Sequence, residues 1–130
     1  LAGLVAITAE PLTPTPGLAI VIGSIGALIM YFGTKMLESF GIDDVVGAIP
    51  VHLFCGIWGT LAAVISNAES SLITQIIGII SIGLFVIVMS SVTWFIIKII
   101  FGLRPTEEEE LIGLDKTECG MDAYPEFKYL

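Results

Sequence analysis

The side chain most suited to chemistry in this sequence is a histidine inside an apolar segment. His52 is the only histidine of the chain, and residues 49–66 around it contain no Asp, Glu, Lys or Arg. Ionisable residues inside membrane spans are costly and usually mark functional sites. A neutral imidazole donates a hydrogen bond at one nitrogen and accepts at the other, which suits a pathway for a small polar molecule or a proton. The alternative is a histidine that only packs against a neighbouring helix.

Two carboxylates precede the same segment. Asp43 and Asp44 stand where side chains can cap free helix amides and favour the positive end of the helix dipole. We expect this structural role, with contact to a substrate as the alternative. Pro50 follows closely, and it either begins the regular helix or kinks it.

Small residues indicate which face of this segment packs on other helices. At helical spacing one face carries His52, Gly56, Gly59 and Ala63. Small residues four apart let helix backbones approach closely in lipid. The spacing therefore predicts that the histidine lies on the packed side, away from lipid.

The composition indicates a membrane protein with an aqueous tail. Apolar residues make up 55% of the 130 residues and charged residues only 14%, against about a quarter in soluble domains. The mean hydropathy is +0.97. Eight of the 13 acidic residues lie in residues 102–130. We therefore divide the chain into a transmembrane region, 1–101, and an acidic aqueous tail, 102–130.

Three apolar segments have the length that a bilayer crossing requires, about 20 residues. They cover about 17–37, 49–66 and 72–101. Residues 1–9 look like the end of a preceding helix, so we expect the sequence to be part of a longer polypeptide. The proline-rich stretch 10–16 is predicted to be a non-helical connection at one membrane face.

Basic residues predict the orientation of the three segments. Lys35 ends the first segment, and Lys98 and Arg104 end the third. Two crossings separate these ends, so they lie on one side. The opposite loops carry Glu10 and Glu69 and no basic residue. We expect a multi-pass protein of the cell membrane with a cytoplasmic C-terminus.

The acidic tail contains signals for ordered structure. Thr106 followed by Glu109 is the pattern of a capping box. Gly113 fits a left-handed helix stop, and Asp115 is predicted to start a second turn that ends at Gly120. This pattern favours a segment that docks, whereas composition alone favours a solvated acidic run.

Other functional classes lack their usual residues. Cys55 and Cys119 have neither metal-site nor disulfide spacing. The five basic residues are scattered, which disfavours nucleic-acid binding. The sequence contains no nucleophile–base pair and no phosphate loop. We expect no enzymatic activity, no catalytic residue, no metal and no cofactor.

Three motifs in order resemble the Amt/Mep/Rh family of ammonium transporters. Residues 2–8 are similar to the end of that family's eighth transmembrane helix. Residues 43–61, with Val51-His52 and Cys55-Gly56-Ile57-Trp58-Gly59-Thr60-Leu61, resemble its tenth helix. Residues 102–125, from Gly102-Leu103-Arg104 to Ala123-Tyr124-Pro125, resemble its cytoplasmic tail. The resemblance covers nearly the whole chain.

The resemblance implies an all-α membrane fold, the C-terminal part of an eleven-helix bundle. In that fold two inverted five-helix repeats are followed by a steeply inclined last helix, and the protein is a homotrimer with one pore per subunit. The three spans would be helices nine, ten and eleven. His52 corresponds to the second histidine of the twin-histidine pore, whose partner belongs to the fifth helix, outside this sequence.

The resemblance also implies nitrogen uptake as ammonium. Ammonium would lose its proton at the outer mouth, and His52 would hydrogen-bond the passing species and relay the proton. Residues 102–130 would be a cytoplasmic regulatory tail that contacts a neighbouring subunit, and bacterial members bind PII-type signalling proteins at the cytoplasmic face. Thr117 corresponds to a threonine whose phosphorylation closes plant members. The tail glycine is Gly120, but Cys119 stands before it where the family often has histidine.

Two other functions fit parts of the pattern. One is an Amt-type ammonium sensor, in which the same bundle reports occupancy to a fused signalling domain. The other is a membrane anchor whose acidic tail binds a partner. The order of the three motifs and the position of His52 disfavour the anchor.

Overall fold

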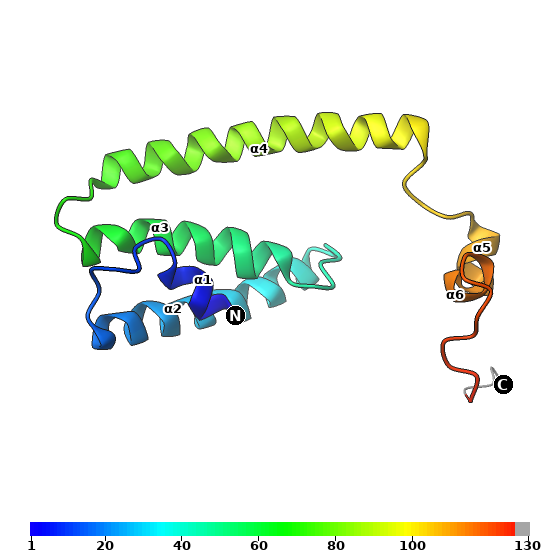
Figure 1. Ribbon diagram of the computed structural model, residues 1–130, viewed down its shortest axis with the longest axis horizontal. Helices are drawn as coiled ribbons and strands as arrows, with labels where there is room; N and C mark the ends of the chain where they lie inside the picture. Colours follow the sequence, from blue (N-terminus) through cyan, green and yellow to red (C-terminus); the bar gives the residue numbers. More distant parts are fainter. Residues whose placement is uncertain (127–130) are drawn as a thin grey trace. The chain divides into compact units, whose positions relative to one another are not determined.

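Helices, joined by loops, are the only regular secondary structure in residues 1–126. A computed structural model describes residues 1–126 (Figure 1). It forms two compact units, of which the first is Leu1–Phe85 and the second begins at Val86. The elements are α1 (Ala2–Ile7), α2 (Pro16–Ser39), a π-helix η1 (Ile49–Phe54), α3 (Cys55–Ser66), α4 (Leu72–Ile100), α5 (Glu107–Ile112) and α6 (Leu114–Thr117).

Helix α2 begins inside the stretch that was expected to be non-helical. Thr15 is its N-cap and accepts a 3.3 Å hydrogen bond from the backbone N–H of Leu18. Pro16 is the first helical residue, a position where the missing N–H of proline costs nothing. The prediction of a non-helical connection is therefore wrong at Pro16, which starts the helix.

The second apolar segment is two kinds of helix in series. Residues Ile49–Phe54 form a π-helix, and Cys55–Ser66 continue as an α-helix. Pro50 lies in the first turn of η1. A π-helix has i→i+5 hydrogen bonds, is rare, and occurs frequently at functional sites. The sequence left open whether Pro50 begins or kinks the helix, and the structure places it at the beginning.

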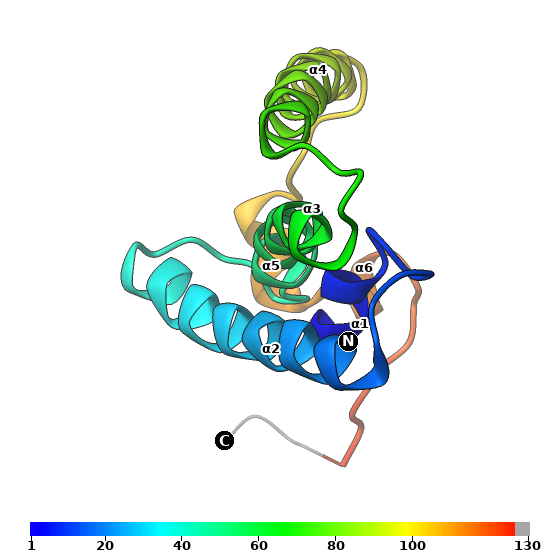
Figure 2. The same ribbon diagram turned by 90° about the vertical axis from the view of Figure 1, so that its left-hand side faces the viewer.

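Helix α1 packs against both α2 and α3 through small residues (Figure 2). A Cβ added at Gly3 would lie 2.9 Å from the carbonyl oxygen of Gly23, and one at Gly26 would lie 2.8 Å from the Cβ of Ala6. A Cβ at Gly59 would overlap the carbonyl oxygen of Ala6. The three backbones approach so closely because these positions have no side chain, as in other membrane helix pairs.

Helix α4 differs from the other long helices because none of its 29 residues is buried. Its surface is formed mainly by Ile, Leu, Val and Phe. Together with Pro16–Ser39 and Ile49–Ser66, it is one of three helices in residues 1–126 that are long and apolar enough to cross a membrane. No strand occurs in residues 1–126, so the predicted all-α membrane fold class is confirmed.

The tail forms two short helices in the second unit. The predicted capping box is present: Thr106 accepts from the N–H of Glu109, and Glu109 accepts from the N–H of Thr106. Gly113 ends α5, as predicted, with a positive φ of 99°, but its ψ of 134° is not that of the left-handed helical conformation. Instead it leads directly into α6, which begins at Leu114, one residue before the predicted start at Asp115.

Candidate functional site

The loop before η1 ends in a carboxylate cap. The two oxygens of Asp44 accept hydrogen bonds from the backbone N–H groups of Ala48, at 2.8 Å, and Ile49, at 2.7 Å. The N–H of Gly47 also donates to the backbone carbonyl of Asp44. These bonds satisfy free amides where the helix begins. Asp43 takes no part in this cap.

Both aspartates line a cavity of about 420 Å³ between the end of α2 and the start of η1. The other lining residues come from three places: Met30, Thr34, Leu37 and Glu38 of α2; Ile42, Val45, Val46 and Gly47 of the loop; and Pro50 and Val51 of η1. His52 does not line this cavity. The structure therefore separates the aspartates from the histidine, although they are close in sequence.

The π-helix places His52 on an exposed face of the chain. The buried positions of this span are Pro50, Cys55, Gly59, Ala62 and Ala63. The buried residues Pro50 and Cys55 are five apart, a spacing that does not share one face in an uninterrupted α-helix. Gly59 and Ala63 then follow at α-helical spacing.

The expected common face of the histidine and the small residues is wrong for the packing within this chain. An uninterrupted α-helix would align His52 with Gly56, Gly59 and Ala63. The π-helix adds a residue to one turn, which rotates His52 out of the face that packs on α1 and α2. Within residues 1–126, the His52 imidazole makes no hydrogen bond shorter than 3.5 Å, whereas the backbone carbonyl of His52 accepts from the N–H of Cys55.

Two side chains of α3 bind backbone carbonyls of α2. The thiol Sγ of Cys55 lies 3.1 Å from the carbonyl oxygen of Gly26 and 3.1 Å from that of Pro50. The indole Nε1 of Trp58 donates to the carbonyl of Ile22 at 3.0 Å. These contacts fix the register of α3 on α2. Neither residue was predicted to position α3, although two side chains with hydrogen-bond donors three apart in an apolar helix were a signal.

The tail positions that were singled out lie in a short folded segment. The hydroxyl of Thr117 donates to the carbonyl of Gly113 at 3.2 Å. Gly120 has φ 64°, a left-handed conformation that favours glycine. Its N–H donates to the carbonyl of Lys116. Cys119 is exposed.

A carboxylate holds this segment closed. The N–H of Ala123 donates to Oδ2 of Asp115 at 2.8 Å, and this bond lowers the pKa of the carboxyl group. The N–H of Met121 donates to the backbone carbonyl of Asp115 at 2.9 Å. An ion pair of 3.1 Å joins Lys116 to Asp122.

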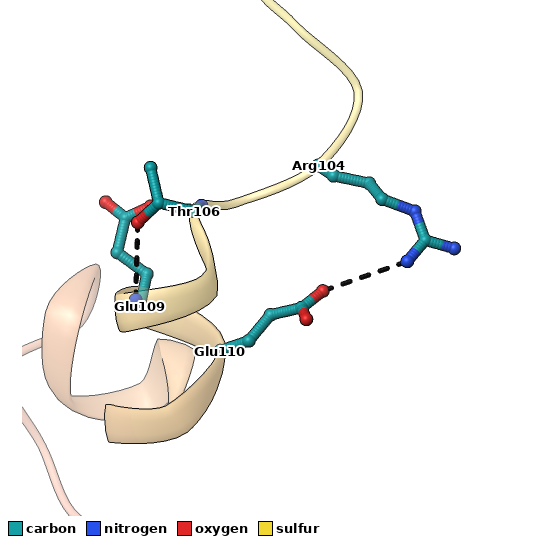
Figure 3. Close-up of polar contacts among 4 residues, drawn as sticks. All are labelled: Arg104, Thr106, Glu109 and Glu110. Carbon is teal, nitrogen blue, oxygen red and sulfur yellow. Dashed lines mark hydrogen bonds and ion pairs between the residues drawn. The ribbon is translucent and has the colours of Figure 1, made fainter.

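Upstream of this loop, Arg104 lies 3.9 Å from Glu110 beside the capping box (Figure 3). Both side chains of this pair are more than half exposed, so the pair adds little stability. The capping box itself is better defined, because Glu109 Oε2 lies 2.8 Å from both the N–H and the hydroxyl of Thr106.

These features define an integral membrane protein with helices long and apolar enough to span the bilayer and an acidic, structured tail. The sequence profile of the Ammonium Transporter Family matches residues 1–124. The chain belongs to the Ammonium Transporter Family. The resemblance that was read from the three motifs is thereby confirmed.

Named relatives agree with this assignment. The chain is 39% identical to the ammonium transporter Amt2 of Archaeoglobus fulgidus, over 97% of this chain and 31% of that protein. It is 38% identical to the putative ammonium transporter sll1017 of Synechocystis, over 92% and 28%. It is 36% identical to the ammonium transporter of Bacillus subtilis, over 95% and 35%. The chain thus spans about a third of the length of these relatives.

Proposed function

We propose that this chain forms part of a pore through which ammonium nitrogen crosses the cell membrane. The observation that carries the proposal is the family match over residues 1–124, with His52 inside one of the three apolar spans. The named relatives are ammonium transporters. This chain supplies part of the pore, and the remaining wall comes from helices outside this sequence.

The proposed mechanism avoids carrying a bare cation through hydrocarbon. A charge at the centre of a bilayer is costly, whereas neutral ammonia can pass an imidazole that offers one donor and one acceptor. His52 would hydrogen-bond the passing ammonia and relay the separated proton, together with a second histidine from outside this chain. Its exposure on η1 supports the proposal, because the side chain is not used for packing within residues 1–126.

The test is charge translocation by the complete polypeptide in liposomes. An ammonium pulse on a solid-supported membrane should give a saturable current, and His52→Ala should change that current or its selectivity without loss of assembly. An unchanged current and selectivity would remove His52 from the pathway. No current from well-folded protein would favour an ammonium sensor instead.

We further propose a homotrimer whose C-terminus is cytoplasmic. The basic residues Lys35, Lys98 and Arg104 support this orientation. The tail after Gly102 would couple the subunits, with Thr117 and Gly120 as regulatory positions and a PII-type protein as a partner at that face.

The regulatory role of the tail can be separated from a role in folding. A phosphate on Thr117 would add negative charge beside Asp115 and Glu118 and oppose the closed loop. Deleting the residues after Gly102 should therefore change transport more than membrane insertion. Equal loss of both would make the tail a folding element.

A further inference from the structure

The π-helix that carries His52 is held by one residue from its C-terminal end. The backbone N–H of Cys55 donates to the carbonyl of His52, and its thiol lies 3.1 Å from the carbonyl of Pro50. Cys55 thus binds the backbone at the histidine and two residues before it. The side chain of Cys55 is fully buried, at 0% exposure.

The same thiol joins the π-helix to α2. Its sulfur is also 3.1 Å from the carbonyl of Gly26, so the single S–H proton lies between one carbonyl of η1 and one of α2. Side-chain hydrogen bonds between membrane helices stabilise one register against others. The thiol therefore fixes both the shape of the π-helix and its place on α2.

The π-helix also fits α2 at a second glycine. A Cβ added at Gly33 would lie 2.7 Å from Cδ2 of Phe54 and 3.3 Å from the Cβ of Pro50. The absence of a side chain at Gly33 therefore leaves room for the side chains of Pro50 and Phe54, which lie at the two ends of η1. With Gly26 at one point and Gly33 at the other, α2 supports the segment on both sides of His52.

We propose that Cys55 is a positioning residue for His52: its thiol maintains the π-helical turn that directs the imidazole away from the packed face of α3. Only the expected effect on transport rests on the proposed function. The positioning of the His52 imidazole by Cys55 is argued from the geometry alone. Without the thiol proton, the span can relax toward an ordinary α-helix. That relaxation would rotate His52 toward the face of Gly59 and Ala63.

The experiment measures the reactivity of His52 directly. Diethyl pyrocarbonate modifies histidine, and peptide mass spectrometry reports its rate at His52 in the complete, folded polypeptide. Ammonium current and ammonium-over-potassium selectivity are recorded on the same preparations. Cys55→Ala removes the donor, and Cys55→Ser keeps an O–H donor at the same place. Trp58→Phe is the matched control, because it removes the other hydrogen bond from α3 to α2 and leaves η1 untouched.

Cys55→Ala should change the modification rate at His52 by about three- to tenfold, the range that corresponds to one hydrogen bond between membrane helices. Cys55→Ser and Trp58→Phe should stay within about twofold of the unmodified protein, and selectivity should change only in Cys55→Ala. An unchanged rate in folded Cys55→Ala would overturn the proposal. Equal changes in all three variants would also overturn it, since the cause would then be packing alone.

A second variant keeps the proposal testable if Cys55→Ala does not fold. Cys55→Val removes the donor but keeps a side chain of similar volume, so it should also change the rate at His52, and no change in folded Cys55→Val would contradict the proposal. The positioning role and the transport function can fail separately. If the modification rate at His52 depends on Cys55 but the protein gives no ammonium current, the positioning role is supported and the transport function is not. If the protein gives an ammonium current but the modification rate at His52 does not depend on Cys55, the transport function is supported and the positioning role is not.

Discussion

The side-chain amide of Asn67 donates a 2.9 Å hydrogen bond to the carboxylate of Glu10, and this bond joins the loop after α1 to the loop after α3. Asn67 is itself oriented, because its side-chain oxygen accepts from the backbone N–H of Glu69 at 2.9 Å. The bond from Asn67 is the main cause of a lowered pKa at Glu10. A residue before the first complete span is thereby connected to the end of the second.

We predict that this connection makes stability depend on pH. The folded-state pKa of Glu10 is depressed, so its contribution is present above the pH at which a free glutamate titrates, about 4.3. The contribution is lost as the pH falls through the lower, folded-state pKa. Glu10→Gln should lower the thermal midpoint in detergent at pH 7, and this difference should shrink as the pH falls below about 4.

Glu69→Gln is the matched control for Glu10→Gln. Glu69 lies in the same loop as Asn67 but contributes only its backbone N–H to the cluster, so its side-chain charge should matter little. Thermal scans of the three proteins between pH 7 and 3.5 compare them. If Glu10→Gln shows the same loss at every pH, the charge of Glu10 does not stabilise the loops.

Two glycines of α3 should respond in opposite ways to alanine. A methyl group at Gly59 would overlap the carbonyl oxygen of Ala6, whereas one at Gly56 meets nothing within 4 Å in this chain. We expect Gly59→Ala to destabilise the protein by about 1–3 kcal/mol, as overpacking does. Gly56→Ala should be neutral or stabilising by less than about 1 kcal/mol, because alanine favours helix.

The measurement for both glycine variants is unfolding of the complete polypeptide in mixed micelles with increasing dodecyl sulfate. Both variants add the same methyl group to the same helix, so the gain in helix propensity is the same in both. The difference in their stability then reports the space around each glycine. Equal stability of the two proteins would show that α1 does not approach α3 as closely as the structure places it.

Much of the fold could be predicted from sequence because membrane spans depend on length and polarity alone. Apolar runs without charges locate Pro16–Ser39 and Leu72–Ile100 within a few residues, since a bilayer requires about 20 such residues. The capping box at Thr106 was also predictable, because its pattern is local. Both partners of the capping box lie within four consecutive residues, so the sequence pattern includes the complete interaction.

The π-helix could not be predicted in the same way. Hydrophobic periodicity assumes 3.6 residues per turn. A residue inserted into one turn rotates all the preceding side chains around the helix axis relative to those that follow. The contacts that hold the insertion are from Cys55 to Gly26 and from Gly33 to Phe54, which are far apart in sequence. For this reason the sequence located His52 along the chain but did not show that it lies outside the face that packs on α1 and α2.

The capping box of α5 should decide whether the tail keeps its helix. Thr106 and Glu109 exchange hydrogen bonds (Figure 3), and the N–H of Thr106 lowers the pKa of Glu109. Thr106→Ala removes the side-chain acceptor for the N–H of Glu109, a loss of about 1 kcal/mol for such caps. Backbone amides of residues 108–112 should then exchange with deuterium about fivefold faster, since local opening follows this free energy.

Glu108→Gln provides the control for the tail helix. Glu108 lies in the same first turn but outside the box, so its removal weakens only the interaction with the helix dipole, about 0.3–1 kcal/mol at an exposed site. Exchange by mass spectrometry in the complete polypeptide compares the three proteins. Faster exchange confined to α5 in Thr106→Ala would identify the box as the local determinant of the helix. Equal rates in Thr106→Ala and the unmodified protein would mean that contacts outside α5 hold the tail, and a docked tail would then be the reason.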